Sequence, residues 1–217
     1  MDIFLDTLDL EVVDKYYTMG IISGVTTNPT LAKRFGMYDD IEMITKLRTI
    51  MKFGEIHVEA FGETTEKILS VVNRLSGIDC NLVFKFPFTE AGVKAVHKLK
   101  HDCLNSARTN MHLIFSHNQA LIATKVGSDY ICPLVGRLDD EGYDGLLFID
   151  ELARIFNRNN VRTKIMVSSV RSPMHVIGAF KAGADAITIP ADVMNRMFYH
   201  KLTDDGFEKF RKDLRGE

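Results

Sequence analysis

The amino-acid sequence predicts an α/β fold, a closed (β/α)8 barrel of the TIM type, from three observations. Short apolar segments rich in β-branched and aromatic residues recur eight times, and a longer stretch with helical spacing follows each of them. No Gly-, Pro- or Ser-rich linker divides the chain, so we expect one domain over residues 1–217. The turn at residues 6–9 lacks glycine, which disfavours the competing doubly wound sheet.

The predicted elements alternate along the chain. The strands are expected at residues 3–6, 24–27, 56–60, 82–87, 111–115, 130–135, 164–169 and 186–190, where the apolar runs are short. The helices are expected at residues 8–19, 39–52, 64–75, 90–99, 118–126, 143–157, 173–181 and 191–198, where apolar residues recur at helical spacing. A further helix at residues 204–214 exceeds the eight units, and its apolar stripe holds Phe207, Phe210 and Leu214.

Composition limits the classes of function. The chain has 217 residues, fewer than the roughly 250 typical of such barrels, but 46% hydrophobic residues suffice for a substantial core. A net charge of −2 gives no basic surplus, so we expect neither a nucleic-acid nor a membrane partner. The acidic second residue and the absence of a long apolar run predict neither a secretory signal nor a spanning helix. We expect a soluble, cytoplasmic protein.

Cysteine and histidine spacing argues against a disulfide framework and a metal site. Cys80, Cys103 and Cys132 form no C-x-x-C pattern, and we expect three reduced, buried thiols. The seven histidines show neither H-x-H nor H-E-x-x-H spacing, so we expect no metal. His117 and His175 are expected in loops or at helix starts.

Alternation along the strands identifies the side chains that face the barrel interior. Leu82, Phe84 and Phe86 share one parity, which turns Lys85 inward. The same alternation gathers Asp6, Thr26, Asn28, His57, Glu59, His112 and Ser116 inside the barrel or at its mouth, and turns Met111, Leu113 and Phe115 outward. Active sites of such barrels lie at the carboxyl ends of the strands, where these polar residues converge.

Lys85 is the candidate nucleophile. Burial of an ammonium ion is costly, so the barrel interior favours the neutral amine. A neutral amine in a closed pocket can form a Schiff base with a carbonyl substrate. The alternative is a structural ion pair with Asp6 or Glu59, because a buried lysine usually has a carboxylate partner. The convergence of polar groups on one rim favours the catalytic interpretation.

Two arginines predict a phosphorylated substrate. Arg137 follows strand six, and Arg171, together with Ser169, follows strand seven on the same face. Phosphate commonly binds near strands seven and eight of such barrels, and arginine donates to it bidentately. Each arginine alone is more typical of a solvated surface charge or of an ion pair with Asp139 or Asp140.

Five segments together resemble a known family. They are residues 24–30 (GVTTNPT), 84–87 (FKFP), 113–116 (LIFS, with Gln119 and Ala120), 135–140 (VGRLDD) and 183–190 (GADAITIP). In combination they look like the transaldolase family, in its small single-domain branch, which also contains fructose-6-phosphate aldolase. The resemblance covers essentially the whole chain.

The resemblance implies a cofactor-free class I aldolase mechanism. Lys85 would form the imine with a ketose, Asp6 would act as general acid and base, and Glu59 would move protons through a bound water. Thr26 and Asn28 would hold substrate hydroxyls, Ser116 would line the pocket, and Arg137, Ser169 and Arg171 would hold the terminal phosphate. The donors would be sedoheptulose 7-phosphate or fructose 6-phosphate, and the acceptors glyceraldehyde 3-phosphate or erythrose 4-phosphate, as in the non-oxidative pentose phosphate pathway.

Two positions favour transaldolase over aldolase, and a third departs from the family pattern. The aldolase branch has Gln and Tyr where this chain has Glu59 and Leu134. Where the family has a threonine that holds the catalytic water, this chain has His112. Three outcomes are open: His112 relays protons, activity is slowed, or the chain binds sugar phosphates without turnover.

The resemblance also implies a homo-oligomer. In the small branch the last helix docks onto an adjacent subunit of a ring, so we expect a ring such as a pentamer or decamer. From residues 204–214 alone, the apolar face fits either the bottom of the barrel or a neighbouring subunit.

Overall fold

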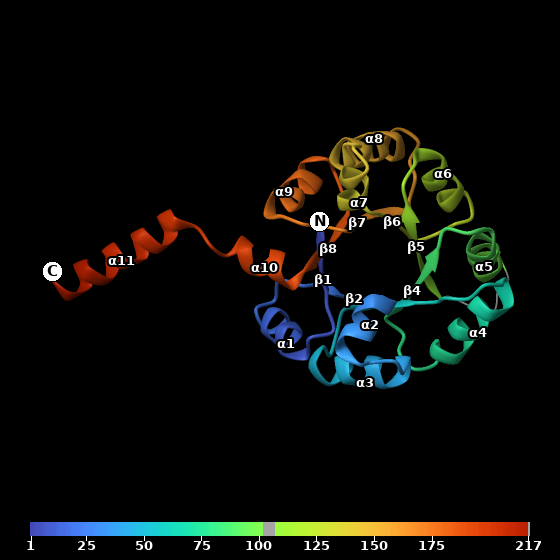
Figure 1. Ribbon diagram of the computed structural model, residues 1–217, viewed down its shortest axis with the longest axis horizontal. Helices are drawn as coiled ribbons and strands as arrows, with labels where there is room; N and C mark the ends of the chain where they lie inside the picture. Colours follow the sequence, from blue (N-terminus) through green and yellow to red (C-terminus); the bar gives the residue numbers. More distant parts are fainter. Residues whose placement is uncertain (102–106, 217) are drawn as a thin grey trace.

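Eight parallel strands form one closed barrel. The computed structural model describes residues 1–101 and 107–216 of the chain. Each strand pairs with the next, and β8 returns to β1, so the predicted (β/α)8 barrel is confirmed (Figure 1). The strands are β1 (Asp2–Asp6), β2 (Gly24–Thr26), β3 (Glu55–Glu59), β4 (Leu82–Pro87), β5 (Arg108–Ile114), β6 (Tyr130–Pro133), β7 (Lys164–Val167) and β8 (Ala186–Pro190).

Helices surround the barrel and include two that we did not predict. The expected ones are α1 (Leu10–Thr18), α3 (Asp40–Ile50), α4 (Thr65–Leu75), α5 (Glu90–His101), α6 (His117–Lys125), α8 (Gly145–Arg158), α9 (Pro173–Lys181), α10 (Ala191–Met197) and α11 (Lys201–Arg215). The unexpected ones are α2 (Pro29–Phe35) and α7 (Val135–Asp140), both at the mouth of the barrel. Asn28 caps α2 and Pro29 occupies its first turn, which are ordinary helix-start signals. Strand β6 is shorter than predicted because α7 begins at Val135.

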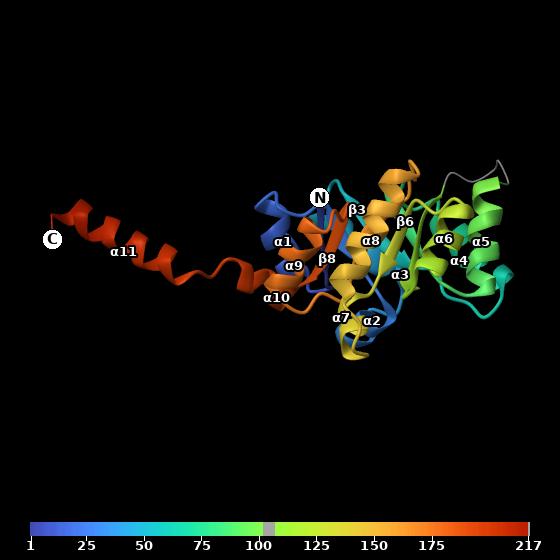
Figure 2. The same ribbon diagram turned by 90° about the horizontal axis from the view of Figure 1, so that it is seen from above.

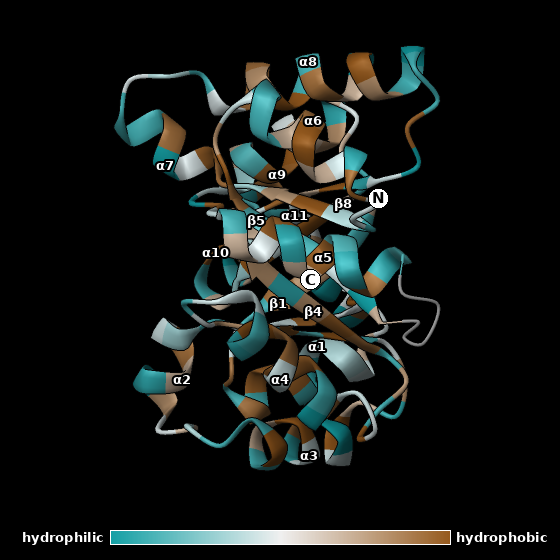
Figure 3. Ribbon diagram, turned by 90° about the vertical axis from the view of Figure 1, so that its right-hand side faces the viewer, coloured by the Kyte–Doolittle hydropathy of each residue, from teal (hydrophilic) through white to brown (hydrophobic). Residues whose placement is uncertain are grey.

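The predicted alternation of side chains is largely confirmed. Leu82, Phe84 and Phe86 pack in the large hydrophobic cluster between strands and helices. A smaller cluster fills the barrel interior: Phe4, Val83, Tyr130, Cys132, Met166 and Ala186. In Figure 3 the helices carry alternating hydrophobic and hydrophilic bands, as expected for helices with one face on the barrel.

Strand β5 breaks the alternation. Its register to β6 shifts between His112 and Ile114, and Leu113 has a φ of 60°. Leu113 therefore lines the cavity at the mouth, and Ile114 packs in the outer cluster instead. The prediction that Leu113 points outward is wrong because a bulge shifts every later position by one.

The cysteine prediction holds only in part. Cys132 is buried in the barrel, whereas Cys80 is exposed. Cys103 lies outside the described residues. Among the residues that the structure covers, no helix is both long and apolar enough to cross a bilayer.

Helix α11 extends away from the barrel (Figures 1 and 2). None of its residues is buried, and Phe207, Phe210 and Leu214 of the predicted apolar stripe are exposed. The helix does not close the bottom of the barrel, so the first of the two placements left open by the sequence is not seen.

Candidate active site

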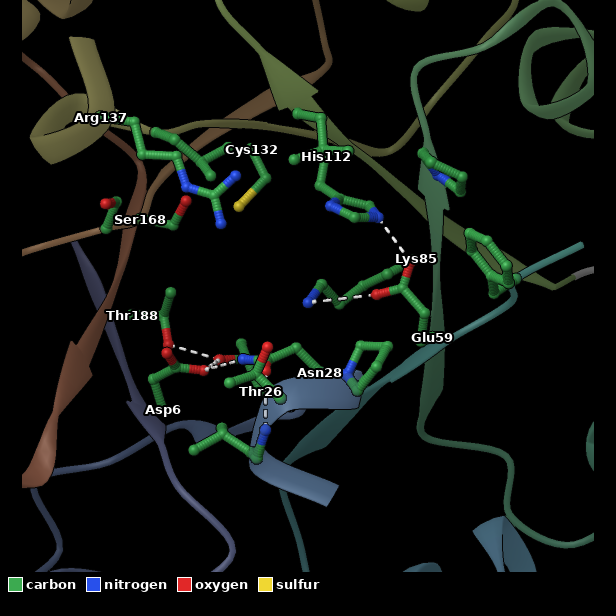
Figure 4. Close-up of a pocket in the computed structure, with 18 residues that line it drawn as sticks. Asp6, Thr26, Asn28, Glu59, Lys85, His112, Cys132, Arg137, Ser168 and Thr188 are labelled. Atoms are coloured by element: carbon green, nitrogen blue, oxygen red, sulfur yellow. Dashed lines mark hydrogen bonds and ion pairs between the residues drawn. The ribbon is translucent and has the colours of Figure 1, made fainter. Parts of the chain in front are cut away.

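A cavity of about 540 Å³ lies at the carboxyl ends of the strands. It is lined by eight of the ten residues predicted for the site: Asp6, Thr26, Asn28, Glu59, Lys85, His112, Arg137 and Ser169. In Figure 4, Lys85 projects toward the centre, with Glu59 and His112 on one side and Asp6, Thr26 and Thr188 on the other. Strands far apart in sequence thus bring an amine, two carboxylates and an imidazole into one cavity.

Lys85 is buried, with 7% of its surface exposed. Its Nζ donates a hydrogen bond to the carbonyl oxygen of Thr27 at 2.6 Å and lies 3.6 Å from Oε2 of Glu59. The ion pair foreseen as the alternative is therefore present with Glu59. It is long, and it leaves the amine at the cavity wall within reach of a bound carbonyl compound.

Glu59 is shared between Lys85 and His112. His112 Nε2 lies 2.6 Å from Oε1 of Glu59. Burial raises the pKa of Glu59, but the hydrogen bond from His112 and the charge of Lys85 outweigh it and leave the pKa below its usual range. Burial lowers the pKa of His112, and the positive charges of Lys85 and Arg137 lower it further. Glu59 acts in the opposite direction but does not cancel the shift. A neutral imidazole that donates from Nε2 to an ionised Glu59 satisfies both shifts and leaves Nδ1, on the opposite side of the ring, as an acceptor (Figure 4).

Asp6 is held by one of its two oxygens. Thr26 Oγ1 donates to Oδ1 at 2.9 Å, and Asn28 Nδ2 donates to the same oxygen at 3.4 Å. Burial raises the pKa of Asp6, although Lys85, Thr26 and Asn28 oppose the shift. Among the described residues Oδ2 makes no hydrogen bond, so this oxygen is available to a ligand in the cavity.

Sequence reasoning missed several lining residues. Thr188 lies on β8, and its Oγ1 is 2.6 Å from Oγ1 of Thr26. Ile187 and Ile189 pack outside the barrel, so the alternation used for the other strands would have found Thr188. Cys132 and Ser168 also line the cavity.

The phosphate end of the predicted site is only partly assembled. Arg137, on α7, and Ser169 line the cavity, but Arg171 does not. Arg171 is half-exposed and forms a bidentate ion pair with Asp140. In this structure Arg171 is therefore in the surface ion pair foreseen as the alternative and does not join Arg137 in lining the cavity.

Ser116 is also displaced from its predicted place. Its Oγ accepts from the backbone N–H of Gln119 and caps α6. It does not line the cavity, because the bulge in β5 intervenes. In the part of the chain that the structure describes, no cluster of His, Cys, Asp or Glu is suited to holding a metal ion.

Comparisons with known proteins agree with this geometry. A sequence profile described as transaldolase/fructose-6-phosphate aldolase matches residues 3–216. A probable transaldolase of Methanococcus vannielii is 44% identical over 213 residues, which cover 98% of this chain and 97% of that protein. A probable transaldolase of Syntrophobacter fumaroxidans is 40% identical over 98% of this chain and 96% of its own length.

Solved structures show the fold alone. A thiamine phosphate pyrophosphorylase from Pyrococcus furiosus superimposes with a TM-score of 0.60 at 16% identity, over 89% of this chain and 87% of the other. A barrel shared at such low identity does not define chemistry. The family is instead shown by the full-length profile match and by the relatives above 40% identity. The chain belongs to the transaldolase/fructose-6-phosphate aldolase family.

Proposed function

We propose that this protein is a transaldolase that transfers a dihydroxyacetone unit between phosphorylated sugars through a Schiff base on Lys85. The observation that carries the proposal is the buried Lys85 amine in a 540 Å³ cavity, with Glu59 on one side and Asp6 on the other. Borohydride trapping tests the lysine, the substrate class and catalytic competence together.

In the proposed reaction the Lys85 amine attacks the ketose carbonyl, and loss of water gives the imine. Asp6 removes the proton of the C4 hydroxyl while the C3–C4 bond breaks, and an aldehyde leaves. The electron pair of that bond passes into the imine and gives an enamine on Lys85. The enamine attacks the carbonyl of the acceptor aldehyde, Asp6 returns the proton to the new alkoxide, and water releases the product.

We assign proton relay to His112 and Glu59. The direct bond between them occupies Oε1 of Glu59, which is the place where a water would bridge to a smaller side chain. Nδ1 of His112 can accept a proton from the cavity, while Nε2 passes one to Glu59. The imidazole thus substitutes for the bridging water during imine formation and hydrolysis.

Thr26 and Asn28 are proposed to position substrate hydroxyls, and Arg137 with Ser169 to bind the terminal phosphate. Arg171 would join them only after leaving Asp140. The proposed donors are sedoheptulose 7-phosphate and fructose 6-phosphate, and the proposed acceptors are glyceraldehyde 3-phosphate and erythrose 4-phosphate. We propose that the protein acts in the non-oxidative pentose phosphate pathway and in the cytoplasm.

Leu134 supports transfer over simple aldol cleavage. It lines the cavity with a side chain that makes no hydrogen bond, so it cannot hold a water that would protonate the enamine. Without a water held at this position to protonate its carbon, the enamine persists until an acceptor aldehyde arrives.

The test is reduction with borohydride in the presence of fructose 6-phosphate, followed by mass spectrometry. We expect one three-carbon adduct at Lys85, none in Lys85→Met, and an unchanged adduct in the control Lys94→Met, a surface lysine on α5. Product release is then compared with and without erythrose 4-phosphate. Absence of the adduct overturns the proposal, and release without an acceptor assigns the aldolase activity instead.

We further propose a ring-shaped homo-oligomer, a pentamer or decamer, built through α11. The support is an exposed apolar stripe on a helix that contacts no core. Sedimentation of the full chain should give a multiple of 24.5 kDa, and removal of residues 201–217 should give the monomer. A full-length monomer would contradict this assembly.

A further inference from the structure

Thr188 and Asp6 are linked through one intervening hydroxyl at the seam where the barrel closes. Asp6 on β1 pairs with Thr26 on β2, while β8, which carries Thr188, pairs with the other edge of β1. The three side chains form an unbroken chain, with 2.6 Å between the two threonine oxygens and 2.9 Å from Thr26 to Oδ1 of Asp6. Both threonines are buried in the cavity wall, with 2% and 4% of their surfaces exposed.

The direction of the chain follows from counting protons. A hydroxyl group has one proton to donate. When Oδ1 of Asp6 is ionised, Thr26 gives its proton to that oxygen, and Thr188 is then the donor to Thr26. When Oδ1 carries a proton, both hydroxyls can reverse, and Thr188 becomes the terminal acceptor. Each protonation state of Asp6 thus has its own satisfied arrangement of the same two hydroxyls.

We infer that Thr188 is a positioning residue that sets the proton affinity of Asp6 through Thr26. The inference rests on the proposed function, because it matters for turnover only if Asp6 exchanges the proton of carbon–carbon cleavage. Donation from Thr188 polarises the Thr26 hydroxyl and strengthens its charge-assisted bond to the ionised carboxylate. Thr188 does not itself need to touch the substrate.

The other ionisable groups around Asp6 are the same in the wild-type protein and in variants of Thr188, so they do not cause a difference in the pKa of Asp6 between them. The titratable or charged side chains that face the cavity are Glu59 from β3, Lys85 from β4, His112 from β5, Cys132 from β6 and Arg137 from α7. Strands β2 and β8 contribute the uncharged Thr26 and Thr188 to the cavity, and Asn28 at the start of α2 is also uncharged. Replacement of Thr188 by valine therefore changes no charge in the cavity and keeps the shape of the side chain.

The primary experiment is a ¹³C NMR titration of the aspartate carboxyls, with the Asp6 signal assigned by its loss in Asp6→Asn. In Thr188→Val we expect the titration midpoint of Asp6 to rise by about 0.5 to 1 pH unit, because the ionised form loses a relayed donor. Thr188→Ser, which keeps the hydroxyl, should restore the wild-type midpoint. Thr65→Val is the matched control, since Thr65 is buried and bonds the carbonyl of Ala91 on the distant α4–α5 face.

Kinetics give the second readout. The acid limb of the rate of carbon–carbon cleavage should move upward by the same amount in Thr188→Val, a loss of about three- to tenfold below the midpoint, while the yield of trapped imine stays unchanged. An Asp6 midpoint that is unchanged in Thr188→Val, or equally shifted in Thr65→Val or Thr188→Ser, overturns the inference. If the valine protein does not fold, Thr188→Cys fills the same space with a weak donor and should shift the midpoint in the same direction.

The two hypotheses fail separately. If wild-type protein forms no adduct and transfers no three-carbon unit, the proposed function is wrong. The NMR titration still decides whether Thr188 controls the protonation of Asp6, because it requires no turnover.

Discussion

Two carboxylates of one cavity, Asp6 and Glu59, differ in environment and therefore in proton affinity. Burial raises the pKa of both, but His112 and Lys85 overcome it at Glu59, whereas Lys85, Thr26 and Asn28 do not overcome it at Asp6. A pair of acidic groups separated in this way is suited to two different roles. Asp6 is the group placed to exchange the proton of carbon–carbon cleavage, and Glu59 rests as an anion that can accept a proton from His112.

This division of roles predicts the behaviour of Asp6→Ala. The imine with Lys85 should still form, because the amine and Glu59 are unchanged. Carbon–carbon cleavage should slow by about 100-fold or more, which is the usual contribution of a positioned acid–base group. Single-turnover kinetics combined with borohydride trapping separates the two steps, and cleavage at the wild-type rate would assign Asp6 another role.

His112 offers a second prediction at the residue scale. His112→Leu removes the ring nitrogen that lies 2.6 Å from Glu59, and we expect turnover to fall by about 10- to 100-fold as the relay is lost. His112→Thr leaves room for a water on Glu59 and should retain more activity than the leucine variant. Steady-state transfer between fructose 6-phosphate and erythrose 4-phosphate measures both.

The outcome also separates the hypotheses left open by the sequence. An inactive wild type and an active His112→Thr would indicate a sugar-phosphate binder rather than an enzyme. An active wild type with a faster His112→Thr would indicate that the imidazole slows turnover. His200→Gln is the control, because His200 lies in the exposed segment before α11.

At the scale of elements, alternation of side chains was enough to place Lys85, Glu59 and Asp6 in the cavity. It failed where the backbone departs from a regular strand. The bulge after His112 turns Leu113 into the cavity and removes Ser116 from it. One extra residue in a strand has no compositional signature, so single-sequence reasoning could not have found it.

Helix α7 was missed for a related reason. It begins at Val135 without a capping side chain, and its first residue continues an apolar run that is typical of a strand. Gly136 allows the close approach of this helix to the loop after β7, because an added Cβ would lie 2.2 Å from the carbonyl oxygen of Ser169. The approach carries Arg137 into the cavity and Asp140 onto Arg171.

The ion pair between Asp140 and Arg171 is expected to weaken phosphate binding modestly, because it holds Arg171 away from the cavity. In Asp140→Asn the ion pair is lost, and Arg171 is free to turn toward a phosphate held by Arg137. We expect KM for phosphorylated substrates to fall by less than about fivefold, since exposed ion pairs are weak. KM for an unphosphorylated acceptor such as glyceraldehyde should not change, and an equal fall for both would contradict this explanation.

At the scale of the whole molecule, closure of the barrel brings side chains from the two ends of the chain into contact. Thr188 meets Thr26 across 162 residues only because β8 returns to β1. The closed barrel also buries a cluster of polar residues at its amino-terminal end, opposite the cavity. There His57 is fully buried between Asn110 and Glu55, and Glu55 also bonds Arg108 and Tyr130.

This buried cluster of polar residues predicts that the free energy of unfolding falls as the solution becomes acidic. Burial lowers the pKa of His57, with Glu55 opposing, so below pH 6.5 the unfolded chain binds a proton that the folded barrel does not. Burial raises the pKa of Glu55, but its bonds to His57 and Arg108 reverse this and bring it from 4.5 to about 2. Both groups therefore lower the stability as pH falls, His57 from pH 6.5 downward and Glu55 from pH 4.5 toward 2.

The expected magnitude is measurable by urea unfolding at a series of pH values. The shift at Glu55 corresponds to roughly 3 kcal/mol of unfolding free energy, present at neutral pH and lost toward pH 2. His57→Gln should flatten the dependence between pH 6.5 and 5, and Glu55→Gln should flatten it below pH 4.5, whereas His200→Gln should change neither. Neutral-pH stability should also fall in Glu55→Gln, because Arg108 keeps its charge without a full partner. A pH dependence that persists in both barrel variants would locate the acid sensitivity elsewhere, for instance at Glu59, whose pKa is also lowered in the folded chain.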